Sequence, residues 1–341
     1  MTRIEKPLVV SAPHPRSLDL VFSDEARARL FDTYEVIECD PGDVAERCGA
    51  RIADVRYVIG QPPISAAMLE RMRSLRCVFN VESNLVANMP YERLFERGIH
   101  TVTTGLVFAE PVAEMGIAMA LALGREVISA DRAFRAGTEL WGRHGNQTAR
   151  QLVGAEVGII GFGDLGKAVN RMLSGFRVTV RACDPWLPPS ILQEHGTIPA
   201  SLPDVLRHSD FVFVTASVTT ENRGVLSAAD FAFMRDGASF ILLSRADVVD
   251  FDDLMAAAHE GRIRVASDVY PEEPLPGDHP VRAIPDFLLS AHRAGGLPTA
   301  LRRMGDMVLE DMELIDRGLP PMRCKRAERE TAIRMRSKGV T

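Results

Sequence analysis

The sequence predicts an α/β protein with two doubly wound parallel-sheet domains, one inserted into the other. Short apolar runs alternate with helical patterns along most of the 341 residues, which is typical of parallel sheets covered by helices. Two long helical patterns, at residues 110–123 and 298–314, separate two strand-rich blocks. A glycine-rich turn at residues 161–166 stands near the middle of the chain, in the second block. These three observations together favour an insertion.

The first block fills about the first hundred residues. Its short apolar runs have the composition of buried strands, and helical segments lie between them. In chain order we expect a strand at 7–11, a helix at 24–34, strands at 36–39 and 55–59, a helix at 66–73, a strand at 76–79, a helix at 91–97 and a strand at 100–103. This block forms one α/β layer without a glycine fingerprint.

The second block follows the long helix expected at residues 110–123. Glu110 and Pro111 suit a helix start, because proline fits the first turn and an acidic side chain complements its partial positive charge. The strands expected after it lie at 157–160, 178–183, 211–215, 238–243, 263–266 and 287–290. The second long helix, at 298–314, then returns the chain to the first block.

The glycine-rich turn has the context of a Rossmann dinucleotide-binding unit. It lies between an apolar strand and a helix at 167–173, and Asp184 ends the next strand. Gly161 permits the tight turn, Gly163 leaves room for a pyrophosphate, and Gly166 lets the helix pack closely. The phosphates then meet the helix N-terminus. Similar glycines also occur in methyltransferases, flavoproteins and plain turns, so the flanking elements carry the prediction.

Two acidic residues refine this prediction. The Asp184 carboxylate is placed to accept hydrogen bonds from the adenosine ribose hydroxyls and would repel a 2′-phosphate, which favours NAD over NADP. Asp164 stands inside the loop expected to hold phosphates. Its side chain would have to point outward, since like charges repel.

Length and composition bound the class of protein. A chain of 341 residues suggests two domains, and a hydrophobic content of 46% supports full cores. No apolar run reaches the length of a membrane span, and the first residues lack the apolar segment of a secretory signal. The cysteines have no CxxC spacing, which favours reduced thiols in the cytoplasm over disulfides or a metal site. They are Cys39, Cys48, Cys77, Cys183 and Cys324.

The charge balance excludes a general nucleic-acid binder. A net charge of −6 offers no overall attraction to phosphate backbones. The basic tail at 323–338 is the exception, and we expect it to be a solvated end. No nucleic-acid or membrane partner is therefore expected.

Three polar residues follow strands of the second block. Arg245 comes after the strand at 238–243, Glu273 after the strand at 263–266, and His292 after the strand at 287–290. The carboxyl ends of parallel strands share one edge, which is where ligands bind. An arginine there can bind a carboxylate through two hydrogen bonds, and a surface ion pair is the less favoured alternative. A histidine oriented by a glutamate is a common acid–base unit.

These motifs in this order resemble the D-isomer-specific 2-hydroxyacid dehydrogenase family over about residues 50–318. The matching stretches are 112–114, 161–166, Asp184 with Pro185, Ser244 with Arg245, Asp268 with Val269, Glu273 with Pro274, and His292 with Gly295 and Gly296. The resemblance implies a Rossmann cofactor domain over 121–297, inserted into a flavodoxin-like substrate domain over 1–120 and 298–341. It also implies a homodimer, with residues 136–141 in the dimerisation arm.

The resemblance assigns roles to individual residues. Arg245 is the expected substrate-binding residue, His292 the acid/base and Glu273 its partner, while Asp268 is expected near the nicotinamide carboxamide. The residues expected to bind NAD are Gly161, Gly163, Asp164, Leu165, Gly166, Asp184, Ser217, Ser244 and Asp268. Those expected to contact the substrate are Ser83, Asn84, Leu85, Arg245 and His292.

The chain also departs from the family pattern. Residues 80–88 replace a glycine-rich loop whose backbone N–H groups hold the substrate carboxylate. Ser217 stands where proline is common, Ala246 where glycine is usual, and Ala291 where proline precedes the histidine. These changes concern the substrate more than the hydride chemistry.

The function predicted from the sequence is that of an NAD-dependent D-2-hydroxyacid dehydrogenase acting on CH–OH groups. Hydride would pass between NAD(H) and a small 2-hydroxy or 2-oxo acid. The alternative is an NAD(H)-responsive, corepressor-like binding protein without turnover, because a fold by itself does not fix a function.

Overall fold

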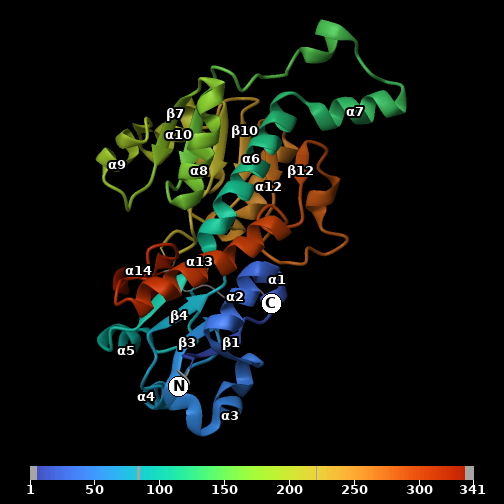
Figure 1. The fold of residues 1–341 in the computed structure, drawn as a ribbon. Coiled ribbons are helices and arrows are strands. Elements are labelled where there is room, and N and C mark those ends of the chain that lie inside the picture. The colour runs from blue at the N-terminus through green and yellow to red at the C-terminus, as the bar shows by residue number, and fades with distance from the viewer. Residues whose placement is uncertain (1–5, 83–84, 220, 335–341) are drawn as a thin grey trace. The chain divides into compact units, whose positions relative to one another are not determined.

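The computed structural model describes residues 6–82, 85–219 and 221–334, and it divides into two compact units (Figure 1). Unit 1 comprises the chain up to Phe108 and from Gly296 onward, and unit 2 comprises Ala109–Gly295. The predicted insertion of one α/β domain into another is confirmed. The predicted boundary at residue 120 falls inside helix α6 (Ala109–Gly124), whereas the units divide at the first residue of that helix.

Unit 1 is built around a sheet with the strand order β13-β5-β4-β3-β1-β2. Its strands are β1 (Leu8–Ala12), β2 (Glu35–Glu38), β3 (Val55–Gly60), β4 (Cys77–Asn80), β5 (His100–Thr103) and β13 (Lys325–Arg326). The first five are parallel, and their order 2-1-3-4-5 is flavodoxin-like, as predicted. The winding reverses between β1 and β3, so the carboxyl ends of these strands form the edge where such sheets bind ligands.

Helices cover both faces of this sheet. Alternate strand residues divide between two cores, with Val9 and Tyr57 in one and Val10 and Val58 in the other. The helices are α1 (Leu18–Val21), α2 (Asp24–Thr33), α3 (Val44–Cys48), α4 (Ala66–Arg71), α5 (Tyr91–Glu96), α13 (Pro298–Asp316) and α14 (Arg329–Arg334). The sequence did not predict the short helices α1, α3 and α14.

Unit 2 contains a parallel sheet in the order β12-β11-β10-β9-β6-β7-β8. Its strands are β6 (Glu156–Ile160), β7 (Thr179–Cys183), β8 (Ile198–Pro199), β9 (Phe211–Val214), β10 (Ser239–Leu242), β11 (Arg264–Ser267) and β12 (Phe287–Leu289). Counted from β6, the order is 3-2-1-4-5-6-7, which is the predicted Rossmann winding with one further strand. Its winding reverses between β6 and β9.

The helices of unit 2 include two that frame its sheet. Helix α6 packs against α8 and against β10, and α10 packs against β6. Besides α6, the helices are α7 (Val127–Ala136), α8 (Asp164–Leu173), α9 (Pro189–Glu194), α10 (Leu202–His208), α11 (Ala228–Phe231) and α12 (Phe251–His259). Of these helices, the sequence predicted α6 and α8 only.

One helical segment among the described residues, Gly105–Gly124, is long and apolar enough to cross a membrane by length and composition alone. Two acids interrupt it, Glu110 and Glu114, and α6 is packed on the sheet of unit 2. A side chain at Gly116 would meet Leu243 at 2.5 Å, which shows how closely α6 approaches the strand edge. This packing is that of a core helix.

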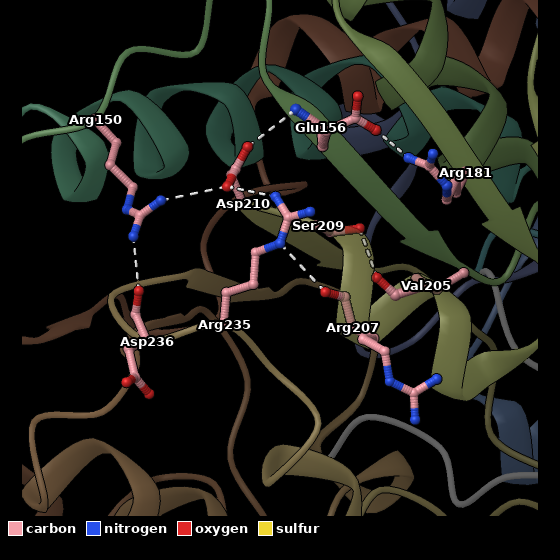
Figure 2. Close-up of polar contacts among 9 residues, drawn as sticks. All are labelled: Arg150, Glu156, Arg181, Val205, Arg207, Ser209, Asp210, Arg235 and Asp236. Carbon is pink, nitrogen blue, oxygen red and sulfur yellow. Dashed lines mark hydrogen bonds and ion pairs between the residues drawn. The ribbon is translucent and has the colours of Figure 1, made fainter.

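The amino ends of the unit 2 strands are joined by a polar network (Figure 2). Asp210, just before β9, accepts hydrogen bonds from Arg150 and Arg235 through one oxygen and from the Glu156 backbone through the other. Arg181 on β7 pairs with the Glu156 side chain. The network holds β6, β7, β9 and the approach to β10 in register at the edge opposite the carboxyl ends.

The basic tail is not a solvated end over its described part. Lys325 and Arg326 pair antiparallel with Thr103 and Val102 of β5, and Ala332 of α14 is buried. Asp311 of α13, which is also fully buried, accepts the backbone N–H groups of residues 322, 323 and 324 at 2.7–2.8 Å. The prediction failed because a buried carboxylate distant in sequence fixes this segment.

We expect Asp311→Asn to lower the free energy of unfolding of unit 1 by about 2–4 kcal/mol, because an amide cannot accept all three N–H groups and loses the charge that strengthens them. Urea unfolding followed by circular dichroism measures this change. Asp306→Asn, at an exposed position on the same helix, should change it by less than about 0.5 kcal/mol. Equal effects of the two substitutions would contradict the anchoring role of Asp311.

Candidate active site

The carboxyl edge of the unit 2 sheet gathers the predicted functional residues. In sheet order they follow β7 (Asp184), β6 (Gly161 to Gly166), β9 (Ser217), β10 (Ser244 and Arg245), β11 (Asp268 and Glu273) and β12 (His292). All these strands are parallel, so their following loops lie at one edge. The sequence pattern therefore located this edge correctly.

The glycine turn has the geometry that its sequence predicts. Gly161 has a φ of 87°, and a side chain there would lie 2.4 Å from the Ala216 Cα atom. A side chain at Gly166 would lie 2.3 Å from the Gly161 carbonyl oxygen, so both positions require glycine. At Gly163 a side chain would meet no atom within 4 Å. The protein thus leaves open space at Gly163, the N-cap residue of α8.

A threonine missed by the sequence reasoning supports this turn. Thr215, buried at the end of β9, donates its hydroxyl hydrogen to the Gly161 carbonyl oxygen at 2.5 Å. It thereby joins the ends of β6 and β9, where the winding of the sheet reverses. In the sequence, only its position directly after the apolar run of β9 could have indicated this supporting role.

Asp184 contacts the glycine turn directly. Its Oδ2 atom accepts the Phe162 N–H at 2.7 Å, and its Oδ1 atom accepts the Trp186 N–H at 3.0 Å. The half-buried carboxylate keeps lone pairs for other donors. Asp164 and Leu165 begin α8 and are also half-buried, and the outward orientation expected of Asp164 stays a prediction.

The residues present fit a dinucleotide. Helix α8 begins without a side-chain cap, and the first N–H groups of a helix have no partners within it. Ser244 is 8% exposed, and its hydroxyl has no hydrogen-bond partner among the described residues. A buried hydroxyl without a partner is unfavourable unless a ligand completes it. Ser217 is exposed in the loop after β9.

Asp268 organises the loop that carries the histidine. It is 1% exposed, and its carboxylate accepts the Ser290 hydroxyl and the N–H groups of Arg293 and Ala294 at 2.5–3.0 Å. Its backbone carbonyl accepts the His292 N–H at 2.8 Å. These bonds hold His292 at a φ of 47°, a left-handed conformation that a residue other than glycine rarely adopts without support. Asp268 is thus a positioning residue, and its predicted contact with the cofactor stays a prediction.

Glu273 and His292 form a pair. The Nδ1 atom of His292 lies 2.5 Å from the Glu273 Oε2 atom, and both side chains are 35% exposed. The other oxygen, Oε1, accepts the Tyr270 N–H at 2.9 Å, which fixes the carboxylate. With Nδ1 engaged, Nε2 is the ring nitrogen left to exchange a proton with a ligand.

Arg245 is half-buried after β10. Its Nη1 atom donates to the adjacent Ser244 carbonyl oxygen at 2.7 Å. The structure therefore brings an arginine, a histidine–glutamate pair and a glycine turn to one sheet edge. This arrangement can hold a dinucleotide and move a proton beside it.

The predicted substrate residues of unit 1 are not all brought to a site by the structure. Leu85 is 7% exposed and belongs to a hydrophobic core, so its side chain contributes to packing. Ser83 and Asn84 lie outside the described residues. The sequence reasoning missed Arg16, Gln61 and Glu82, which follow β1, β3 and β4 at the carboxyl edge of the unit 1 sheet.

Comparison with known families identifies the chain. Residues 117–294 match the family model of the D-isomer specific 2-hydroxyacid dehydrogenase, NAD binding domain. The chain belongs to this family. It is therefore an NAD-linked hydroxyacid oxidoreductase, and the predicted cofactor, NAD(H), is confirmed.

Individual relatives agree with this assignment. A glyoxylate reductase of Korarchaeum cryptofilum is 30% identical over 262 residues, covering 76% of this chain and 79% of its own. A D-3-phosphoglycerate dehydrogenase of Methanocaldococcus jannaschii is 25% identical over 298 residues, covering 86% of this chain and 56% of its own. The crystal structure of a phosphoglycerate oxidoreductase from Rhizobium etli is 64% identical, with a TM-score of 0.89 over 95% of this chain and 99% of that one.

We expect Gly163→Ala to raise the Kd for NADH about tenfold or more without destabilising unit 2, because the added methyl group occupies space that the protein leaves open. Fluorescence titration measures binding, and urea unfolding measures stability. Gly175→Ala, where a side chain would also meet no atom within 4 Å, is the matched control. Unchanged NADH affinity in Gly163→Ala would contradict the placement of the phosphates.

Proposed function

We propose that this protein reversibly reduces a small 2-oxo acid to the D-2-hydroxy acid, with NADH as the reductant. The His292–Glu273 pair at the carboxyl edge of a Rossmann sheet carries this proposal, because it supplies a proton donor where the fold binds its cofactor. Bound NADH supplies the hydride that adds to the carbonyl carbon, and NAD+ accepts it in the reverse direction.

The proton chemistry belongs to His292. Protonated at both nitrogens, it gives the Nε2 proton to the carbonyl oxygen as negative charge develops there, while Nδ1–H stays with Glu273. In the oxidation, neutral Nε2 takes the proton from the hydroxyl group. The reaction consumes NADH, one proton and the 2-oxo acid, and releases NAD+ and the 2-hydroxy acid.

Arg245 is the proposed anchor for the substrate carboxylate. A guanidinium offers two parallel N–H groups in the plane that a carboxylate needs, and it also polarises the neighbouring carbonyl group. Ser83, Asn84 and Leu85 remain predicted substrate contacts. For the cofactor, the proposed contacts are Gly161, Gly163, Asp164, Leu165, Gly166, Asp184, Ser217, Ser244 and Asp268.

A homodimer is part of the proposal. Residues 127–147 project from unit 2 as an arm (Figure 1), and Phe134, Leu140 and Trp141 on it are 61–72% exposed. Arg264 of β11 ties the base of the arm, donating to the Glu126 side chain at 2.6 Å and to the Thr148 carbonyl oxygen at 2.9 Å. A fixed base with exposed aromatic residues favours a protein partner, and a second copy is the partner that the family resemblance implies.

The proposed compartment is the cytoplasm. All five cysteines are free thiols. Burial raises the pKa of the Cys48 and Cys77 thiols, which keeps them protonated and unreactive. Cysteines that remain free thiols are typical of proteins in a reducing compartment.

His292→Ala should lower kcat by about 10²- to 10⁴-fold while the Kd for NADH changes less than about threefold, because the variant loses the proton donor but keeps the nucleotide site. Absorbance of NADH with a panel of 2-oxo acids gives the rate. His259→Ala, at the exposed end of α12, is the matched control. Near-normal turnover of His292→Ala would refute the assignment.

The same panel separates catalysis from a binding function. A wild-type protein that binds NADH tightly but consumes it with none of the acids would instead be an NAD(H)-responsive binding protein. Consumption of NADH with at least one acid excludes that alternative.

Replacing Phe134 and Trp141 together by aspartate should convert the dimer into a monomer, because two charges would be buried in an apolar contact. Light scattering after size exclusion measures the mass. Leu319→Asp, also at an exposed apolar position, should leave the mass unchanged. A wild-type monomer would refute the proposed dimer.

A further inference from the structure

The loop that carries Glu273 lies at the surface of unit 2. Residues 271–274 follow β11 without regular secondary structure, and all four are exposed. His292, by contrast, is held through its backbone N–H by the buried Asp268. Exposed loops fluctuate unless contacts with a fixed part of the molecule restrain them. The 2.5 Å contact between Glu273 and His292 therefore depends on what holds the loop before and after Glu273.

Tyr270 holds the loop before Glu273. Its backbone N–H donates to the Glu273 Oε1 atom at 2.9 Å, and its hydroxyl donates to the Ser267 carbonyl oxygen at 3.1 Å. Tyr270 is 9% exposed, and its ring packs edge-on against Phe251 with 5.9 Å between the ring centres. Burial raises the pKa of the Tyr270 hydroxyl to about 12, so it stays a donor at neutral pH. This end of the loop is thus fixed to the core.

Arg282 holds the loop after Glu273. Its Nε atom donates to the Pro276 carbonyl oxygen and its Nη2 atom to the Leu275 carbonyl oxygen, both at 2.9 Å. These carbonyl groups lie two and three residues after Glu273 in the chain. A guanidinium presents several N–H groups in one rigid plane, so it can hold two successive carbonyl groups at once. The bonds close the loop on its C-terminal side.

The turn that carries Arg282 is itself anchored. This turn is the 3-10 helix η7 (Pro280–Ala283), and its Val281 is fully buried in the core of unit 2. His279 caps the turn, because its Nδ1 atom accepts the Val281 N–H at 3.3 Å. The His279 ring also lies against Phe251, with 6.4 Å between the ring centres. Phe251 therefore supports both ends of the loop, and Arg282 extends from a fixed base.

We propose that Arg282 is a positioning residue for the proton chemistry, because its hold on the loop keeps the Glu273 carboxylate at Nδ1 of His292. The catalytic part of this inference rests on the proposed function. Arg282 acts through Glu273 and transfers no proton itself. While Glu273 accepts the Nδ1 proton, the neutral ring leaves Nε2 unprotonated and ready to accept a proton. If the loop moves, Glu273 no longer selects this tautomer.

The tautomer of His292 provides a test that needs no substrate. Full-length protein with isotope-labelled histidine is measured by long-range proton–nitrogen NMR at about pH 9, where histidine is ordinarily neutral. In the wild type the proton should reside on Nδ1, because Glu273 accepts it there. Arg282→Met keeps an apolar stem but loses both donors, and it should move the proton toward Nε2, as Glu273→Ala does. The signal missing from His292→Ala identifies the residue.

Kinetics test whether Arg282 acts through Glu273. Arg282→Met should lower kcat for an accepted 2-oxo acid about 10-fold, with less than about a threefold change in the Kd for NADH, because two charge-assisted hydrogen bonds are lost outside the nucleotide site. In a Glu273→Ala background the same substitution should change kcat less than about twofold, since the residue through which it acts is gone.

Arg282→Lys is the conservative variant. A lysine keeps the charge and can donate to one carbonyl group, but it lacks the planar fork. It should therefore retain more of the kcat and more of the Nδ1 tautomer than Arg282→Met. Circular dichroism checks that each variant is folded.

Arg97 in unit 1 provides the matched control. Its guanidinium also donates to two backbone carbonyl oxygens, those of Leu69 and Met72, and the residue is half-buried. Arg97→Met removes the same kind of double contact at the end of α4. It should leave both kcat and the His292 tautomer unchanged.

Two results would overturn the assignment. One is a wild-type tautomer in folded Arg282→Met. The other is an equal fall in kcat with and without Glu273, which would mean that Arg282 only supports the fold. A wild type that consumes NADH with none of the acids refutes the proposed function instead, and the NMR measurement then decides alone whether Arg282 holds the pair together.

Discussion

The parallel pairing of the unit 2 strands is the constraint on which the candidate site depends. In a parallel sheet all strands end at the same edge, so residues separated by more than a hundred positions in the chain become neighbours. The glycine turn after β6, Arg245 after β10 and His292 after β12 share an edge for this reason. At the opposite edge, Asp210 and its arginines hold the strands in register, which keeps the carboxyl ends aligned.

Buried polar groups turn this shared edge into a defined site. Parallel strands supply position, but the loops between them have no regular hydrogen bonding of their own. The Asp268 carboxylate accepts backbone N–H groups of the loop after β12. The Thr215 hydroxyl donates to a backbone carbonyl of the turn after β6. A buried carboxylate is stable only when donors surround it, and the Asp268 carboxylate finds them in Ser290, Arg293 and Ala294. Its backbone carbonyl supports the left-handed His292. The His292–Glu273 pair is thus held in place by Asp268, which need not take part in the chemistry.

In unit 1, too, carboxylates with little exposure fix other groups by hydrogen bonds. Asp311 uses its oxygens to bind the C-terminal segment. Glu82 instead fixes the guanidinium of Arg16 across the end of β3.

The sequence by itself determined the two parallel sheets, their winding, the glycine turn and the edge on which Arg245, Glu273 and His292 lie. These features depend on local patterns, namely apolar runs, glycines at fixed spacing and polar residues at strand ends. The five-residue helix α3 was not predicted, because it is too short to show the periodicity of a helix. Only the tertiary structure decided that Asp268 positions His292, that Asp311 binds the tail, and that Arg16 meets Glu82. Each of these contacts is a hydrogen bond between segments distant in the sequence. Folding decides which groups meet, so residue spacing along the chain does not predict the partners.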